Sequence, residues 1–80
     1  MDSKEKFKRV FTQVFDLPPD QINIDLTQNE VAKWDSLAQI ELVVSLEEVF
    51  NINLQLEEII LMNSVKSIAD ILQKKGVTVL

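Results

Sequence analysis

Residues 34–50 read WDSLAQIELVVSLEEVF, and this pattern predicts a helix. We expect the helix to begin at Asp35-Ser36 and to run to about Phe50, where Asn51 breaks the pattern. Its inward stripe has the spacing i, i+4, i+7, i+8 and comprises Leu42, Leu46, Val49 and Phe50. A stripe of this kind is sufficient to bury one side of the helix in a small core.

The same helix carries a second stripe that mixes apolar and acidic side chains. At about 100° per residue, this stripe comprises Leu37, Ile40, Glu41, Val44 and Glu48, with Glu47 beside Ile40. Two interpretations are open. Either its apolar members pack under a loop or a short neighbouring helix, or the stripe is a docking surface. In a docking surface, charge speeds encounter and small apolar contacts fix the register.

Upstream, apolar residues at i, i+3, i+4 and i+7 predict a helix from about residue 3 to 15. They are Phe7, Val10, Phe11 and Val14. Asp2 or Ser3 is the expected N-cap, and the two prolines after Leu17 cannot continue the helix. A long connection over residues 16–35 follows, and we expect three side chains to anchor it to the core: Ile22, Ile24 and Leu26.

Downstream, we expect a short helical turn near Glu57 to Leu61 and then a last helix. Ser64 caps that last helix, Gly76 ends it, and its apolar stripe comprises Val65, Ile68, Ala69 and Leu72. The whole pattern predicts an all-α fold, a small four-helix bundle. It has three main helices, a short third helix and a long loop between the first and second, in a single domain over residues 1–80.

The composition excludes several classes of chemistry. The chain has no cysteine and no histidine, so it can form neither a disulfide nor a Ser-His-Asp triad, and we do not expect an enzyme. We expect no metal site, because a calcium loop needs a central glycine and the chain has only Gly76. The longest apolar run, residues 59–62, is far shorter than the ~20 residues of a membrane span. We therefore expect a cytoplasmic monomer.

Charge is distributed unevenly along the chain. The net charge is −5, and residues 34–65 hold six acidic residues but no lysine or arginine. We do not expect nucleic acid as a partner, because binding to phosphates requires clustered lysine and arginine. The acidic block is either a solvated surface or a docking surface for a basic partner.

Ser36 stands at the start of the predicted helix and of its mixed stripe. In the ordinary interpretation, the Asp-Ser pair supplies an N-cap and nothing more. Only one of the two can be the cap, however, and if Asp35 caps, Ser36 lies in the first turn with its hydroxyl free. A phosphate on that hydroxyl would face the positive end of the helix dipole, which stabilises an anion by roughly 0.3–1 kcal/mol.

Several short motifs occur together: Trp34-Asp35-Ser36-Leu37, Ile40-Glu41-Leu42-Val43, Leu46-Glu47-Glu48-Val49-Phe50, Glu57-Glu58 and Ser64-Val65. In this combination the chain resembles the acyl carrier protein family over nearly its whole length. The resemblance implies that Ser36 receives 4′-phosphopantetheine from coenzyme A, transferred by a phosphopantetheinyl transferase with Mg²⁺. Asp35 and Leu37 would be its recognition neighbours. The thiol of the arm would carry acyl groups as thioesters in fatty acid, polyketide or related biosynthesis.

The resemblance also implies partners and a place for the cargo. Acyl-activating, acyltransferase or synthase enzymes would present basic patches to Glu41, Glu47 and Glu48. Apolar contacts with these enzymes would come from Leu37, Ile40 and Val44. Short acyl chains would lie between the second and third helices, in a space lined by Leu46, Ile59, Leu61, Met62 and Ile68.

Two features depart from the family pattern. Lys33 stands where many members have glycine, and we expect Trp34 to pack where a small residue would sit. Val49 occupies a position that is frequently acidic. One alternative to a carrier stays open, a small acidic helical adaptor that binds a basic partner without modification.

Overall fold

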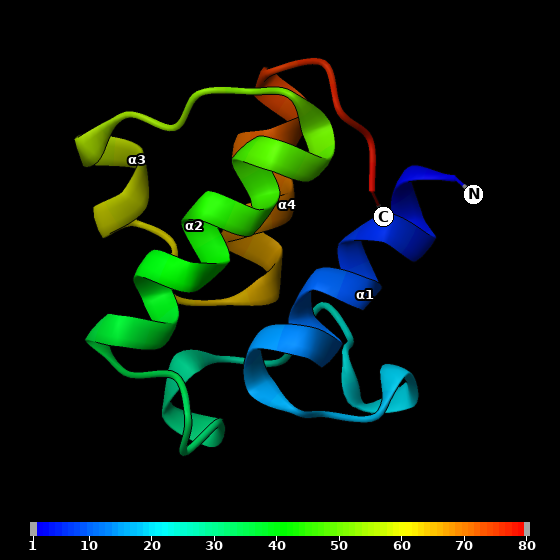
Figure 1. The fold of residues 1–80 in the computed structure, drawn as a ribbon, viewed down its shortest axis with the longest axis vertical. Helices are drawn as coiled ribbons and strands as arrows, with labels where there is room; N and C mark the ends of the chain where they lie inside the picture. Colours follow the sequence, from blue (N-terminus) through cyan, green and yellow to red (C-terminus); the bar gives the residue numbers. More distant parts are fainter. Residues whose placement is uncertain (1, 80) are drawn as a thin grey trace.

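The computed structural model describes residues 2–79 of the chain. These residues contain four α-helices and two short 3-10 helices (Figure 1). They are α1 Ser3–Phe15, η1 Pro19–Gln21, η2 Gln28–Glu30, α2 Ser36–Phe50, α3 Leu56–Ile60 and α4 Val65–Lys74. The predicted all-α four-helix fold is confirmed. The two ends of the predicted domain, residues 1 and 80, lie outside the described residues. Within the described residues, no helix is both long and apolar enough to cross a membrane.

Local side-chain chemistry explains where the helices begin and end. Asp2 caps α1 by accepting a hydrogen bond from a first-turn amide at 2.9 Å, and Asp16 ends it in the left-handed region with φ of 56°. Ser64 caps α4 by accepting a hydrogen bond from the Ser67 amide at 3.0 Å. Beyond the last turn, Gly76 has φ of 88°, which glycine adopts without strain. The expected caps and the expected stop at Gly76 are confirmed.

An aromatic column forms the centre of the core. The ring centroids of Phe7 and Phe11 lie 4.9 Å apart, and those of Phe11 and Phe15 lie 5.7 Å apart. Trp34 is buried against this column, with centroid distances of 6.0 Å to Phe11 and 4.8 Å to Phe15. The surrounding buried side chains of α2 and α4 include Leu42, Leu46, Ile68 and Leu72. Trp34 thus anchors the turn before α2 in the core, as its position predicts.

The prediction that Val49 belongs to the buried stripe of α2 is wrong. Val49 is exposed and lies in an open hollow that is also lined by Lys6, Arg9 and Gln13 of α1. The buried side of α2 consists of Ala38, Leu42, Val43 and Leu46, and Phe50 packs half-buried against it. Helical spacing gives the direction of a side chain, but it does not say how far the neighbouring helix covers it.

The connection between α1 and α2 contains both 3-10 helices and is partly anchored. Ile22 is buried and Leu26 is half-buried against the core, as predicted. Ile24 is exposed, so the expectation that it anchors the loop is wrong. It stands in a turn that is stabilised by a 3.0 Å hydrogen bond from the Asp25 amide to the Asn23 side chain. The turn directs Ile24 away from the core.

The end of this connection is fastened to the segment before α4. Thr27 and Ser64 form an isolated antiparallel bridge. Beside it, the Gln28 amide donates to the Asn63 carbonyl at 2.8 Å. The bridge holds the chain that leads into α2 against the start of α4.

α3 lies at the edge of the fold, away from α1 (Figure 1), with Ile59 packed against the core and polar contacts made by Glu58. All five of its residues remain at least partly exposed. Gln55 and Glu58 form a capping box at its start, and Lys75 Nζ lies 2.9 Å from Glu58 Oε1. Leu61, in the turn after α3, is exposed. The expectation that Leu61 lines the space between α2 and α3 is wrong, because this turn leaves its side chain in solvent.

Glu58 makes the stability of this region depend on pH. The Gln55 amide, and then the Lys75 ammonium, hold the pKa of Glu58 below its ordinary value. A carboxyl whose pKa is lower in the folded state stabilises the fold above its unfolded pKa, about 4.3 for Glu, and this contribution is lost as the pH falls through the folded pKa. We expect Glu58→Gln to lower the melting temperature at neutral pH, and the difference from the unsubstituted protein to disappear in acid. Melting curves from neutral to strongly acidic pH measure this, with Glu57→Gln on the same helix as the control; a difference that persists in acid contradicts it.

Candidate functional site

Ser36 is the first residue of α2, and Asp35 caps the helix in front of it. Asp35 Oδ1 accepts the Ala38 amide at 2.9 Å, and the Asp35 carbonyl accepts the Gln39 amide at 2.9 Å. The Ser36 side chain is exposed, and its hydroxyl has no hydrogen-bond partner within residues 2–79. Of the two residues that could cap α2, Asp35 is the one that does, and the Ser36 hydroxyl is therefore left free.

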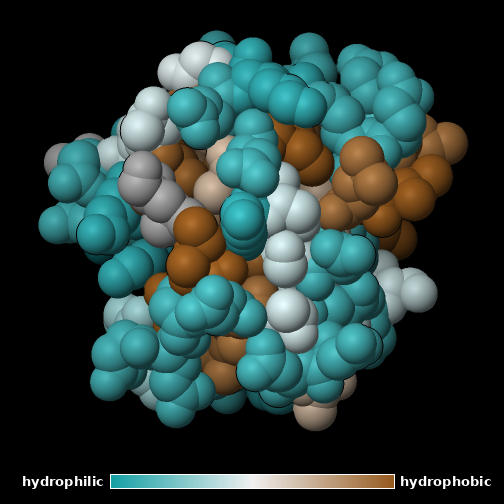
Figure 2. Space-filling model, turned by 180° about the vertical axis from the view of Figure 1, so that it is seen from behind, coloured by the Kyte–Doolittle hydropathy of each residue, from teal (hydrophilic) through white to brown (hydrophobic). Residues whose placement is uncertain are grey.

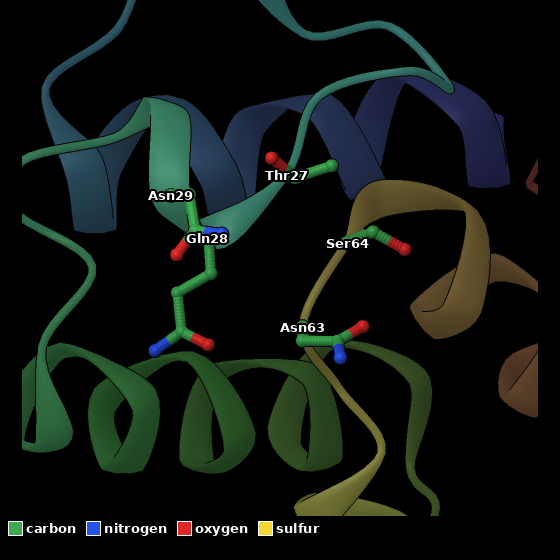
Figure 3. A pocket seen from close by; sticks show the side chains of 5 residues that line it. All are labelled: Thr27, Gln28, Asn29, Asn63 and Ser64. Carbon is green, nitrogen blue, oxygen red and sulfur yellow. The ribbon is translucent and has the colours of Figure 1, made fainter.

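The hydroxyls of two other serines, Ser64 and Ser67, are engaged. Ser64 Oγ and Ser67 Oγ lie 3.1 Å apart in the cap of α4. Ser64 Oγ also accepts the Ser67 amide, and Ser67 Oγ donates to the Ser64 carbonyl. Ser64 also borders a polar hollow: Figure 3 shows Thr27, Gln28 and Asn29 on one side of it, and Asn63 and Ser64 on the other. The five residues that line this hollow are uncharged. Ser36 differs from Ser64 and Ser67 because its oxygen is both exposed and free to react.

The surroundings of Ser36 suit a phosphate ester. At the first turn of a helix, the amides of Ser36 and Leu37 have no carbonyl one turn earlier to which they could donate. The positive end of the α2 dipole adds a favourable potential for an anion at this place. The Asp35 carboxylate, the neighbouring negative charge, is itself engaged with the Ala38 amide. These residues therefore form a place where a phosphate ester on Ser36 Oγ would be stabilised.

A shallow hollow of about 360 Å³ adjoins Ser36. It lies between the first turns of α2 and the C-terminal end of α3, and it is lined by Gln28, Ser36, Gln39, Ile40, Ile59, Ile60 and Met62. Its lining mixes amide groups with aliphatic side chains. An arm attached at Ser36 would find both hydrogen-bonding and apolar surface beside its point of attachment.

Gln39 is a residue of this hollow that the sequence analysis missed. Its Oε1 accepts the indole N–H of Trp34 at 2.6 Å, and its Nε2 donates to the carbonyls of Ile59 at 3.1 Å and Met62 at 3.0 Å. The Trp34 carbonyl in turn accepts a hydrogen bond from Gln28 Nε2 at 3.1 Å. The sequence did contain a signal. The N–H of a buried tryptophan needs an acceptor. Gln39, one helical turn after Ser36, is a polar side chain close to Trp34 along the chain.

The predicted docking stripe of α2 faces solvent. Leu37, Ile40 and Val44 are 66%, 61% and 46% exposed, so the interpretation that they pack under the loop or α3 is wrong. Glu41 and Glu48 are exposed beside them. We call these five residues the α2 face.

Glu47 stands apart from the α2 face. It is half-buried, and its Oε2 accepts the Leu54 amide at 3.0 Å, so its carboxylate holds the chain between α2 and α3. Three exposed apolar residues of α3 and the turn after it were not predicted as surface: Leu56, Ile60 and Leu61. In Figure 2, seen from behind, hydrophobic side chains gather at the right-hand edge, where the half-turn from Figure 1 brings α3. The exposed apolar surface is therefore larger than α2 alone provides.

Comparison with known proteins shows the family of the chain. The phosphopantetheine attachment site family matches residues 5–72. The acyl carrier proteins of Buchnera aphidicola subsp. Acyrthosiphon pisum, strains Tuc7 and APS, are each 32% identical over 73 residues, which is 91% of this chain and 91% of each relative. 4′-Phosphopantetheine is therefore the prosthetic group of this chain. From the family match over most of its length and the similarity to these relatives, the chain belongs to the acyl carrier protein family.

Proposed function

We propose that the protein shuttles acyl groups between biosynthetic enzymes, with 4′-phosphopantetheine attached to Ser36 Oγ. The observation that carries this proposal is the exposed, unpartnered hydroxyl at the first turn of α2, inside the region that the family matches. In the attachment step, Ser36 Oγ forms a new P–O bond with the phosphate of coenzyme A that bears pantetheine. Adenosine 3′,5′-bisphosphate leaves, and the hydroxyl proton goes to a base of the transferase.

The composition supports a carrier that depends on its partners. The chain has no cysteine, so the thiol that forms a thioester has to come from the arm. It has no histidine, the commonest general base, so acyl transfer would be catalysed by the enzymes it visits. A pathway of fatty acid, polyketide or related synthesis would supply such enzymes.

The test is the intact mass of the protein after incubation with coenzyme A, Mg²⁺ and a phosphopantetheinyl transferase. We expect a gain of the mass of one phosphopantetheine group. An unchanged mass with several transferases contradicts the proposal. The mass of the protein isolated from its native host would further report the acyl group that it holds.

We infer that the α2 face binds basic patches on these enzymes, through Glu41 and Glu48 with the apolar contacts of Leu37, Ile40 and Val44. The exposure of all five residues supports this, and so does the lack of any lysine or arginine in residues 34–65. Glu47 would contribute less, because its carboxylate already accepts the Leu54 amide.

Reversing charge on the α2 face is expected to slow modification. At low ionic strength, we expect Glu41→Lys with Glu48→Lys to reduce the rate of arm transfer by tenfold or more, since steering can raise association rates by about 10–10³-fold. Added salt should shrink the difference, because it screens exposed charges. The control is Asp20→Lys with Asp70→Lys, which changes the net charge equally at exposed sites outside the α2 face. Equal rates for the two double variants at low salt contradict the docking role.

A further inference from the structure

The Gln39 side chain joins the turn before α2 to the end of α3 and the residues that follow it. Its oxygen is bonded to the Trp34 indole in the turn before α2, and its nitrogen is bonded to the carbonyls of Ile59 in α3 and Met62 after it. The donors and the acceptor of this one amide group are all used at 2.6–3.1 Å. Ile59 is in the last turn of α3 and its carbonyl also accepts the Met62 amide at 3.1 Å, whereas Met62 lies two residues beyond the helix.

α3 is short and contributes one half-buried side chain, Ile59, to the core, while buried Leu54 and Met62 flank it. It has five residues, far fewer than the 12–15 that an isolated helix needs even to be marginal in water. Leu56 and Ile60 project into solvent, and Ile59 is half-buried. The Glu58–Lys75 ion pair holds the side of α3, and Gln39 holds its C-terminal end.

Gln39 also stands between Ser36 and the core. Both residues line the hollow beside α3, and Met62, a buried core residue, lines it too. The hollow therefore brings Ser36, Gln39 and a buried core side chain to one place. A cargo chain that entered the core here from an arm on Ser36 would pass beside the bonds from Gln39 to Ile59 and Met62.

We propose that Gln39 is a latch, a positioning residue that holds α3 closed and decides whether cargo on the Ser36 arm enters between α2 and α3. This inference rests on the proposed function as far as it concerns cargo, whereas the latch itself is a property of the unmodified chain. When Gln39 releases the Ile59 and Met62 carbonyls, the C-terminal end of α3 loses these two bonds to α2, while the buried Met62 side chain still anchors the residues that follow. Trp34 is the only tryptophan of the chain, and its indole N–H is bonded to the Gln39 side-chain amide. It therefore reports movement of Gln39.

The latch is tested first on the unmodified protein, by amide hydrogen exchange in nuclear magnetic resonance. The Leu61 and Met62 amides, bonded to the carbonyls of Glu58 and Ile59, report α3, and the Trp34 indole N–H reports the other side of the latch. We expect Gln39→Leu to speed exchange at all three by about tenfold or more, because it removes two bonds to α3 and one to Trp34. Gln73→Leu, an exposed glutamine of α4, is the matched control. Equal exchange in the two variants overturns the latch.

A second variant separates the two sides of the latch and covers the case in which Gln39→Leu does not fold. Gln39→Glu keeps an oxygen for the Trp34 N–H but removes both donors to α3. We expect faster exchange at Leu61 and Met62 with the Trp34 N–H still protected. Unchanged exchange at Leu61 and Met62 overturns the proposal.

The role in cargo entry is tested on protein that carries an octanoyl group on its arm, with occupancy of Ser36 confirmed by mass. We expect the octanoyl group to raise the melting temperature more in Gln39→Leu than in the unsubstituted protein or in Gln73→Leu, each relative to its own unloaded form. Equal increases in all three overturn the role of Gln39 in entry. If Ser36 accepts no arm, the proposed function fails, while the exchange measurements on unmodified protein still decide whether the latch exists.

Discussion

Ser36→Ala is expected to abolish the gain of phosphopantetheine completely while leaving the fold unchanged. The substitution removes the only atom that the attachment site supplies to the new bond. It costs the fold little, because the exposed Ser36 hydroxyl makes no hydrogen bond within residues 2–79 and Asp35 provides the cap. Surface substitutions of this kind usually change stability by less than about 0.5 kcal/mol.

Intact mass and melting temperature, measured on the same samples, check both parts of this expectation. Ser45→Ala is the matched control, since Ser45 lies on the same helix and is half-buried away from the first turn. It should be modified like the unsubstituted protein. A mass gain in Ser36→Ala would place the attachment on another residue. The adaptor alternative differs in one result, since an adaptor would bind its partner equally well with Ser36→Ala and without any arm.

Phe11→Ala is expected to have the largest effect on stability. Phe11 is fully buried at the centre of the aromatic column, with ring centroids of Phe7, Phe15 and Trp34 at 4.9, 5.7 and 6.0 Å. Removing a buried phenylalanine side chain costs about 3–5 kcal/mol, which in a domain of this size corresponds to roughly 12–40 °C in melting temperature. Small domains have only about 5–15 kcal/mol in total. Much of the protein should therefore be unfolded at physiological temperature.

Two further variants, measured by thermal or urea unfolding, provide the comparison for this expectation. Phe50→Ala removes the same ring from a half-buried position and should cost clearly less. Leu56→Ala removes an exposed side chain and should change stability by less than about 0.5 kcal/mol. A loss for Phe11→Ala no greater than that for Phe50→Ala would mean that the aromatic column does not dominate the core.

The helices of this protein could be predicted closely because their signals are local. Asp2, Asp35 and Ser64 are strong N-caps, and each precedes an apolar pattern of helical period. The same reasoning gave Asp35 and Ser36 as the two possible caps of α2, and the structure shows that Asp35 is used and the Ser36 hydroxyl is free. The prediction of the helices and of Ser36 as the candidate residue therefore depended on contacts within three or four positions along the chain.

The errors concern residues whose environment is set by segments far away in sequence. Val49, Ile24 and Leu61 are apolar and suitably spaced, yet each is exposed, because no other segment covers it. Gln39 was missed for the complementary reason. Its partners Ile59 and Met62 lie 20 and 23 positions further on, and no local pattern indicates which carbonyls a glutamine amide will meet.

The bridge between Thr27 and Ser64 affects the order in which folding and attachment of the arm occur. It closes a long loop, which slows its formation relative to the helices, whose contacts are local. The nascent polypeptide already contains the Asp-Ser-Leu triplet, but the entry to α2 is positioned only when both sides of this bridge have been synthesised and paired. We therefore expect a transferase that reads the shape of this entry to act only after residues 27 and 64 have paired, so that attachment of the arm also reports that the carrier has folded.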